Sequence, residues 1–138
     1  MDTVSQGAER PRPAVLVVDD NPDVRRLVVV ALRKRYEVLE AGSGTEAMSI
    51  LAERMGGPAE RYVRAVLVDI LMPGMDGLTL CEAIKARYDV PVLMLTAAGT
   101  ASNLRTAVAK GADDYVLKPF TQDLLLAKVG IWVHPDFS

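Results

Sequence analysis

The chain has 138 residues, of which 50% are hydrophobic and 25% charged, and its formal net charge is −2. This length suits one domain with one hydrophobic core, and the composition is ordinary for a globular protein. The weak net charge gives no electrostatic reason to expect nucleic acid or an anionic membrane as the main partner. The single cysteine, Cys81, excludes an internal disulfide and is predicted to be a small buried hydrophobe. No signal peptide or membrane-spanning run is recognisable, so we expect a cytoplasmic protein.

Four short apolar runs predict strands that are buried on both faces. Their residues do not alternate between apolar and polar, which is typical of a parallel sheet covered by helices on both sides. A weaker run at residues 36–39 is a further candidate strand. The strong runs are residues 15–18, 66–68, 92–95 and 115–117.

Helical periodicity predicts a helix after each of these strands. The first is capped by Asn21 with Pro22 in its first turn, and the second opens at Ser43 or Thr45. The others are expected at about 76–87, at 101–110 and from about residue 121 onward. The residues that we assign to the buried faces are Val24, Leu27, Val28, Leu32, Ala47, Ile50, Leu51, Leu80, Ala83, Ile84, Leu124, Leu125, Val129 and Trp132.

Strands and helices therefore alternate along the whole chain. Crossover connections between parallel strands are right-handed, so helices must cover both faces of the sheet. The expected fold class is α/β: a (βα)5, flavodoxin-like, doubly wound parallel sheet of five strands in the order 2-1-3-4-5. We expect this domain to span residues 13–133, between a disordered N-terminal tail at 1–12 and a C-terminal tail at 134–138.

Polar side chains stand at the carboxyl ends of the strong strands. Asp19 and Asp20 follow the first, and Asp69, Thr96 and Lys118 follow the others in turn. These ends lie at one edge of a parallel sheet, so the side chains should converge. Three adjacent carboxylates repel one another unless a hard divalent cation such as magnesium holds them. A metal, an ammonium group and a hydroxyl around a carboxylate nucleophile suit phosphoryl transfer that yields an acyl phosphate.

Each of these residues also has a plain structural interpretation. Asp20 and Asn21 could cap the helix behind them, Asp69 could open a turn, and Lys118 could be a solvated charge. Their joint occurrence at strand ends along one edge favours a shared site.

The ordered set of motifs resembles the receiver domains of response regulators in two-component signal transduction, of the chemotaxis-regulator type. The similarity covers residues 14–133. The segments that carry it are Asp19-Asp20, the run DILMPGMDG from Asp69 to Gly77, Thr96-Ala97-Ala98, the run GADDY from Gly111 to Tyr115, and Lys118-Pro119-Phe120.

This resemblance implies a role for each residue of the site. Asp69 would be the phosphoacceptor, and Asp20 and Asp69 would bind magnesium directly, with manganese as an alternative ion. The backbone carbonyl of Leu71 would be a further ligand, and Asp19 would orient a metal-bound water. Lys118 would pair with the phosphoryl oxygens.

The resemblance also implies a switch. Thr96 would swing to hydrogen-bond the phosphoryl oxygens, Tyr115 would turn inward into the space that Thr96 leaves, and the surface of the last two helices and the last strand would change. The Lys118–Pro119 peptide is expected to be cis, as in the family.

The implied partner is a histidine kinase or histidine phosphotransfer protein. The only histidine, His134, follows the last predicted helix, so the domain holds no phosphohistidine donor at its own site. We expect a signalling protein that catalyses only its own phosphorylation and dephosphorylation, as a docking protein, as a step of a phosphorelay, or as part of a longer regulator whose output domain is missing. No direct nucleic-acid or membrane partner is expected, and a phosphorylation-dependent homodimer is an alternative.

Two other functions stay open. A carboxylate-nucleophile phosphatase usually shows Asp-x-Asp after the nucleophilic strand, and Asp69-Ile70-Leu71 lacks the second aspartate. A pseudo-receiver would bind partners without phosphorylation, against which the complete acidic pair, Asp69, Thr96 and Lys118 argue.

Several remaining features are weaker signals. Residues 42–47 match the dinucleotide fingerprint G-x-G-x-x-A but follow the second strand, so the glycines are expected to shape a turn. Leu71 and Ala98 cannot hydrogen-bond an attacking water through their side chains, which predicts slow autodephosphorylation. Residues 53–64 form a longer polar linker than usual, and Gly130 should weaken the last helix.

Overall fold

A computed structural model describes residues 12–70, 72, 76–97 and 101–133 of the chain, with the backbone alone for residues 101–104. Its sheet has five parallel strands in the order β2-β1-β3-β4-β5, so the predicted fold class and strand order are confirmed. The strands are β1 (Ala14–Val18), β2 (Glu37–Ala41), β3 (Val63–Asp69), β4 (Val92–Thr96) and β5 (Asp114–Leu117).

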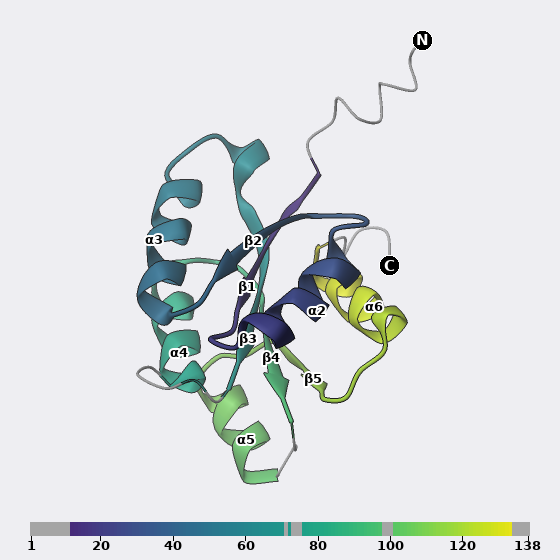
Figure 1. Cartoon of the computed structure of the whole chain (residues 1–138). Helices are drawn as coiled ribbons and strands as arrows, with labels where there is room; N and C mark the ends of the chain where they lie inside the picture. Colours follow the sequence, from purple (N-terminus) through teal and green to yellow (C-terminus); the bar gives the residue numbers. More distant parts are fainter. Residues whose placement is uncertain (1–11, 71, 73–75, 98–100, 134–138) are drawn as a thin grey trace.

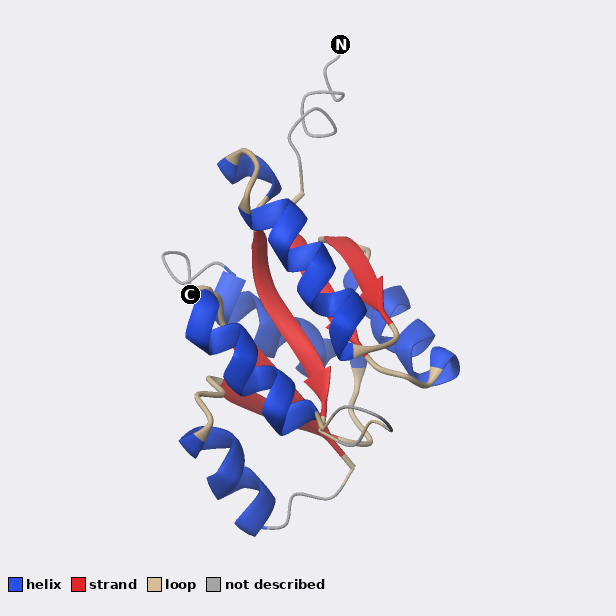
Figure 2. Ribbon diagram, turned by 90° about the vertical axis from the view of Figure 1, so that its left-hand side faces the viewer, coloured by secondary structure: helices blue, strands red, loops and turns tan. Residues whose placement is uncertain are grey.

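Helices enclose the sheet on both faces (Figures 1 and 2). They are α2 (Pro22–Leu32), α3 (Gly44–Met55), α4 (Gly77–Arg87), α5 (Ala101–Ala109) and α6 (Gln122–Val133), with the short 3-10 helix η1 (Ala59–Arg61) before β3. Helices α2 and α6 lie together on one face, and α3, α4 and α5 lie on the other (Figure 1). Among the helices that the structure describes, none has the length and apolar character needed to cross a bilayer.

Local sequence explains where three of these helices begin. The side chains of Asn21, Ser43 and Asp76 accept hydrogen bonds from backbone N–H groups at the starts of α2, α3 and α4. Such caps satisfy donors that a helix leaves without an internal partner. Asn21 therefore takes the capping role that was also open to Asp20, which leaves the Asp20 carboxylate for other contacts.

The hydrophobic core has two layers, one on each side of the sheet. In β1, Leu16 and Val18 pack toward α3 and α4, whereas Val15 and Val17 pack toward α2 and α6. Strands β3 and β4 divide their buried residues between the two layers in the same way. Continuous apolar strands are required for this arrangement, because successive side chains point to opposite faces. Strand β5 does not divide its residues in this way: Val116 is buried but Tyr115 and Leu117 are exposed, so the prediction that residues 115–117 are buried on both faces is wrong.

Two residues that we assigned to buried helix faces are exposed. Leu27 of α2 has 66% of its surface accessible and Leu124 of α6 has 43%, so both predictions are wrong. Each stands at the start of an unbroken apolar run, LVVVAL in α2 and LLL in α6. An apolar run without polar residues does not indicate which of its residues face the core. In the structure, the residues that follow Leu27 and Leu124 are the buried ones.

The polar linker before β3 is fixed by two arginines. Arg54, which is buried, forms a forked ion pair with Glu37 at 2.7 Å and also donates to the carbonyl of Arg61. Arg64 donates to the carbonyl of Ala59 at 3.1 Å. The hydrogen bond from Arg54 is the main reason why the pKa of Glu37 lies below its usual value. The polar linker is thus a surface segment around η1 that these hydrogen bonds hold in place.

Candidate functional site

Strand register brings the predicted site residues to one edge of the sheet. Val18 pairs with Val68, so Asp19 and Asp69 come next on neighbouring strands. Asp69 pairs with Leu95, and Thr96 follows directly. Thr96 in turn pairs with Leu117, after which the chain reaches Lys118. Parallel strands in register must present their next residues together, which is why sequence position alone predicted the convergence.

Three carboxylates meet at this edge and form what we call the acidic cluster: Asp19, Asp20 and Asp69. One carboxylate oxygen from each lies within 4.8 Å of the other two. The ammonium nitrogen of Lys118 is 3.7 Å from Oδ2 of Asp69 and 3.8 Å from Oδ2 of Asp19. Thr96 is buried beside them at the end of β4.

Asp19 is the most constrained member of the acidic cluster. Its side chain is fully buried, and its Oδ1 accepts a hydrogen bond from the backbone N–H of Asn21 at 2.9 Å. Its other oxygen, Oδ2, accepts no hydrogen bond from any residue that the structure describes. A buried carboxylate oxygen without a hydrogen bond is costly, and the ammonium of Lys118, 3.8 Å away, is too far to donate one. A metal ion bound directly would relieve more of that cost. The donor set of carboxylate oxygens therefore fits a hard divalent ion such as magnesium.

The position of Lys118 is set by the backbone around it. Its N–H donates to the carbonyl of Thr96 at 2.7 Å, and the peptide bond from Lys118 to Pro119 is cis, as expected. The lysine side chain is only 21% exposed and faces carboxylates. The alternative interpretation of Lys118 as a solvated surface charge does not hold.

The comparisons with known proteins agree with this geometry. Residues 15–130 match the family described as response regulator receiver domain. The chain belongs to this family. Its receiver domain is 37% identical over 122 residues to a probable transcriptional regulator, ycf27, of Porphyra purpurea, covering 88% of the chain and 47% of the relative. It is also 34% identical over 119 residues to the DNA-binding response regulator MtrA of Mycolicibacterium smegmatis, with 86% and 49% of the two chains covered.

Solved structures show the same fold. A crystal structure of a response regulator from Thermotoga maritima superposes with a TM-score of 0.76 and 31% sequence identity, covering 88% of this chain and 98% of that one. The receiver domain spans about half the length of the curated relatives that it matches, so those relatives are longer.

A second polar network lies on the side of the receiver domain formed by α5, β5 and α6. Asp114 accepts hydrogen bonds from Lys128 and from the indole of Trp132, each at 2.9 Å. Burial acts to raise the pKa of Asp114, but these bonds and that from the N–H of Tyr115 together lower it. Trp132 packs against the core, as predicted.

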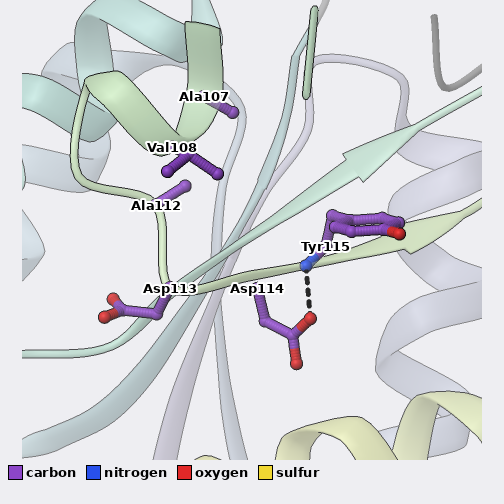
Figure 3. A pocket seen from close by; sticks show the side chains of 6 residues that line it. All are labelled: Ala107, Val108, Ala112, Asp113, Asp114 and Tyr115. Carbon is purple, nitrogen blue, oxygen red and sulfur yellow. Dashed lines mark hydrogen bonds between the residues drawn. The ribbon is translucent and has the colours of Figure 1, made fainter. Parts of the chain in front are cut away.

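The ring of Tyr115, which is predicted to switch, lies at the surface in this structure. It is 39% exposed, and the ammonium of Lys128 stands 5.3 Å from its centre. Figure 3 shows the hollow beside it, a pocket of about 140 Å³ where the turn after α5 meets β5. The pocket is lined by Ala107, Val108, Ala112, Asp113, Asp114 and Tyr115.

Sequence reasoning missed the roles of two residues near the acidic cluster. Gly77, the first residue of α4, packs so closely on β3 that a Cβ there would lie 2.1 Å from the backbone oxygen of Asp69. Arg25 of α2 donates to the backbone carbonyl of Asp19 at 2.7 Å. The sequence signal that could have identified Gly77 is its place in the motif that begins at Asp69. No motif around Arg25 indicated its role.

Several predictions fall on residues outside those that the structure describes. They are the Leu71 carbonyl as a metal ligand, the effect of Leu71 and Ala98 on phosphoryl lifetime, the placement of His134, the C-terminal tail at residues 134–138, and the N-terminal tail at residues 1–12, of which only Arg12 is described. These stay predictions. The prediction for Cys81 is confirmed, since the thiol is buried and burial raises its pKa to about 11.

Proposed function

We propose that this receiver domain accepts a phosphoryl group on Asp69 in a magnesium-dependent reaction and thereby changes its α5-β5-α6 surface. The observation that carries the proposal is the acidic cluster, with carboxylate oxygens within 4.8 Å of one another and Lys118 3.7 Å from Asp69. The buried Oδ2 of Asp19 supports a metal ion there, because no described residue donates a hydrogen bond to it and the ammonium of Lys118 comes no closer than 3.8 Å.

Asp20 and Asp69 would hold the ion directly, Asp19 would act through a bound water, and the carbonyl of Leu71 would be a further ligand. When bound, magnesium supplies positive charge beside the phosphoryl oxygens. A carboxylate oxygen of Asp69 attacks the phosphorus of a phosphohistidine donor. The bond from phosphorus to the histidine nitrogen breaks, and that nitrogen keeps the electron pair. The product is an acyl phosphate on Asp69.

Lys118 and Thr96 would read the new charge. A phosphoryl group brings about −1.5 to −2 charges and new acceptor oxygens. The ammonium of Lys118 already lies close enough to pair with the phosphoryl oxygens, and the hydroxyl of Thr96 would donate a hydrogen bond to one of these oxygens. Tyr115, now at the surface, would turn toward the space that Thr96 vacates. This is a local charge event that biases a two-state surface.

The donor would be a phosphohistidine of a histidine kinase or phosphotransfer protein. The changed surface would act on a downstream protein, on a second copy of the domain, or on an output domain in a longer chain. MtrA is named a DNA-binding response regulator and is about twice as long as the matched region, which supports the last possibility. A phosphatase or a pseudo-receiver would be the alternatives.

The proposal is tested with the intact chain, acetyl phosphate and magnesium, followed by intact mass. We expect a gain of one phosphoryl group that disappears in Asp69→Asn and when EDTA is present. Asp89→Asn is the matched control, because Asp89 is an exposed aspartate beside β4 at the opposite end of the sheet. No mass gain in the unaltered chain would contradict phosphorylation, and turnover of many phosphate esters would favour the phosphatase.

A further inference from the structure

Arg25 connects the acidic cluster to the neighbouring edge of the sheet. It lies in α2, with its side chain 21% exposed, and it makes two side-chain bonds. Its Nη1 donates to the backbone carbonyl of Asp19 at 2.7 Å, and its Nε donates to the carboxylate of Glu40 in β2 at 2.9 Å. The guanidinium therefore spans the turn after β1 and the end of β2. A planar fork of this kind holds two acceptors in a fixed relative position.

These bonds complete a set that fixes every polar group of Asp19 except Oδ2. The N–H of Asp19 donates to the carbonyl of Ala41 at 3.1 Å, Oδ1 accepts from the N–H of Asn21, and the carbonyl accepts from Arg25. Within the described part of the chain, Oδ2 alone lacks a hydrogen bond, and the ammonium of Lys118 lies 3.8 Å from it. The rotation of the Asp19 peptide decides where this oxygen lies and where the next residue, Asp20, begins.

The glycine-rich turn after β2 leaves space for this contact. A Cβ at Gly42 would lie 3.3 Å from Nη1 of Arg25, which is tighter than ordinary van der Waals contact. The N–H of Gly42 is held by the carboxylate of Glu46 at 2.7 Å. The glycine that makes residues 42–47 look like a dinucleotide fingerprint thus has a packing reason, which is room for the guanidinium.

We propose that Arg25 is a positioning residue that orients the Asp19–Asp20 pair for the divalent cation. This inference rests on the proposed function, since it concerns the ion that the acidic cluster would hold. Arg25 acts through the backbone of Asp19 and touches neither the ion nor the phosphoryl group. Residues that orient metal ligands in this way commonly change metal affinity by about 10- to 100-fold when they are removed.

The direction of the change in magnesium affinity distinguishes a positioning role of Arg25 from a simple charge effect. A guanidinium near three carboxylates repels an incoming cation, so its loss should tighten magnesium binding if charge alone mattered. Loss of the orienting bond should instead weaken binding, because the carboxylates no longer converge without rearrangement. Arg26, the next residue, is exposed and carries the same charge, so Arg26→Ala is a matched control for the charge effect.

The test is a magnesium titration of the intact chain by calorimetry. We expect Kd to rise about tenfold in Arg25→Ala and to stay near the wild-type value, or to fall slightly, in Arg26→Ala. Arg25→Lys keeps the charge but loses the fork, and it should also bind more weakly. Gly42→Ala should displace the guanidinium slightly and give an intermediate Kd, which keeps the test available if Arg25→Ala does not fold.

Phosphorylation by acetyl phosphate provides a second readout. At saturating magnesium the rate of Arg25→Ala should return to within about threefold of wild type, since its defect is in affinity. Equal or tighter magnesium binding in Arg25→Ala and Arg25→Lys, relative to Arg26→Ala, would overturn the positioning role while leaving the proposed function intact. Absence of magnesium binding in the unaltered chain would overturn both.

Discussion

A single methyl group at position 77 should displace Asp69, the proposed phosphoacceptor. Gly77 begins α4, and its N–H donates to the carbonyl of Ile70 at 3.0 Å. A Cβ at this position would lie 2.1 Å from the backbone oxygen of Asp69 and 2.8 Å from Cα of Ile70. A carbon and an oxygen in close contact need roughly 3.3 Å. The start of α4 and the end of β3 must therefore separate by about 1 Å, because neither contact involves a flexible side chain.

Both stability and chemistry should respond to Gly77→Ala. Overpacking of this kind typically costs about 1–3 kcal/mol of unfolding free energy. Since the shift falls on the backbone of Asp69, the reacting oxygen also moves, and a misplacement of about 1 Å can cost roughly 100-fold in rate. The rate of phosphorylation by acetyl phosphate at saturating magnesium measures the second effect, and urea denaturation measures the first.

The control for this prediction is the same substitution at Gly130. A Cβ at Gly130 has ordinary space, with the hydroxyl of Tyr36 3.9 Å away. A folded Gly77→Ala protein that is phosphorylated within about twofold of the wild-type rate would refute the reasoning, because a shift of about 1 Å at the nucleophile could not be silent.

Three further outcomes follow from the same contacts. Gly130→Ala should raise the free energy of unfolding by about 0.5–1 kcal/mol, because alanine favours the helix and fits beside Tyr36; a lower urea midpoint would contradict this. The lowered pKa of Asp114 means that its bonds to Lys128 and Trp132 stabilise the fold fully above the unfolded value of about 4 and are lost as pH falls through the lower folded pKa. Denaturation from pH 7 to pH 3 should therefore show a steeper loss in the wild type than in Asp114→Asn, and equal slopes would argue against it. Magnesium at about 100 times its Kd should stabilise the chain by about 2.7 kcal/mol, and EDTA should abolish that gain in a thermal melt; an unchanged melting temperature would contradict binding to the acidic cluster.

The architecture was predictable because the three central strands are buried on both faces. Residues 15–18, 66–68 and 92–95 have no polar face, which is typical of strands covered on each side. Parallel register then determines the site, since the residues after paired positions must lie side by side. For this reason Asp19, Asp69, Thr96 and Lys118 could be placed at one edge from sequence position alone.

What the sequence left open depends on contacts between distant segments. The exposed positions of Leu27 and Leu124 could not be read from apolar runs that define no helix face. The bond from Trp132 to Asp114 joins residues 18 positions apart, and the role of Gly77 depends on how α4 meets the end of β3. Periodicity describes one element at a time, so it predicts neither how helices rotate on the sheet nor where two backbones touch.

Bringing the carboxylates of the acidic cluster together is energetically unfavourable, which is why contacts between distant segments matter for the proposed function. Asp19 is fully buried, and one of its carboxylate oxygens has no hydrogen bond to the residues that the structure describes, which is unfavourable in an apolar interior. The backbone of Asp19 bonds to Ala41 and to Arg25, and in the proposed positioning role of Arg25 these bonds would keep the carboxylate in that position. A more relaxed turn would let the side chain reach water and would lower the cost, but the carboxylates would then no longer converge. One ammonium group, that of Lys118, faces the three carboxylates of the acidic cluster. The unfavourable placement of Asp19 is thus the physical reason to expect a metal ion there as well.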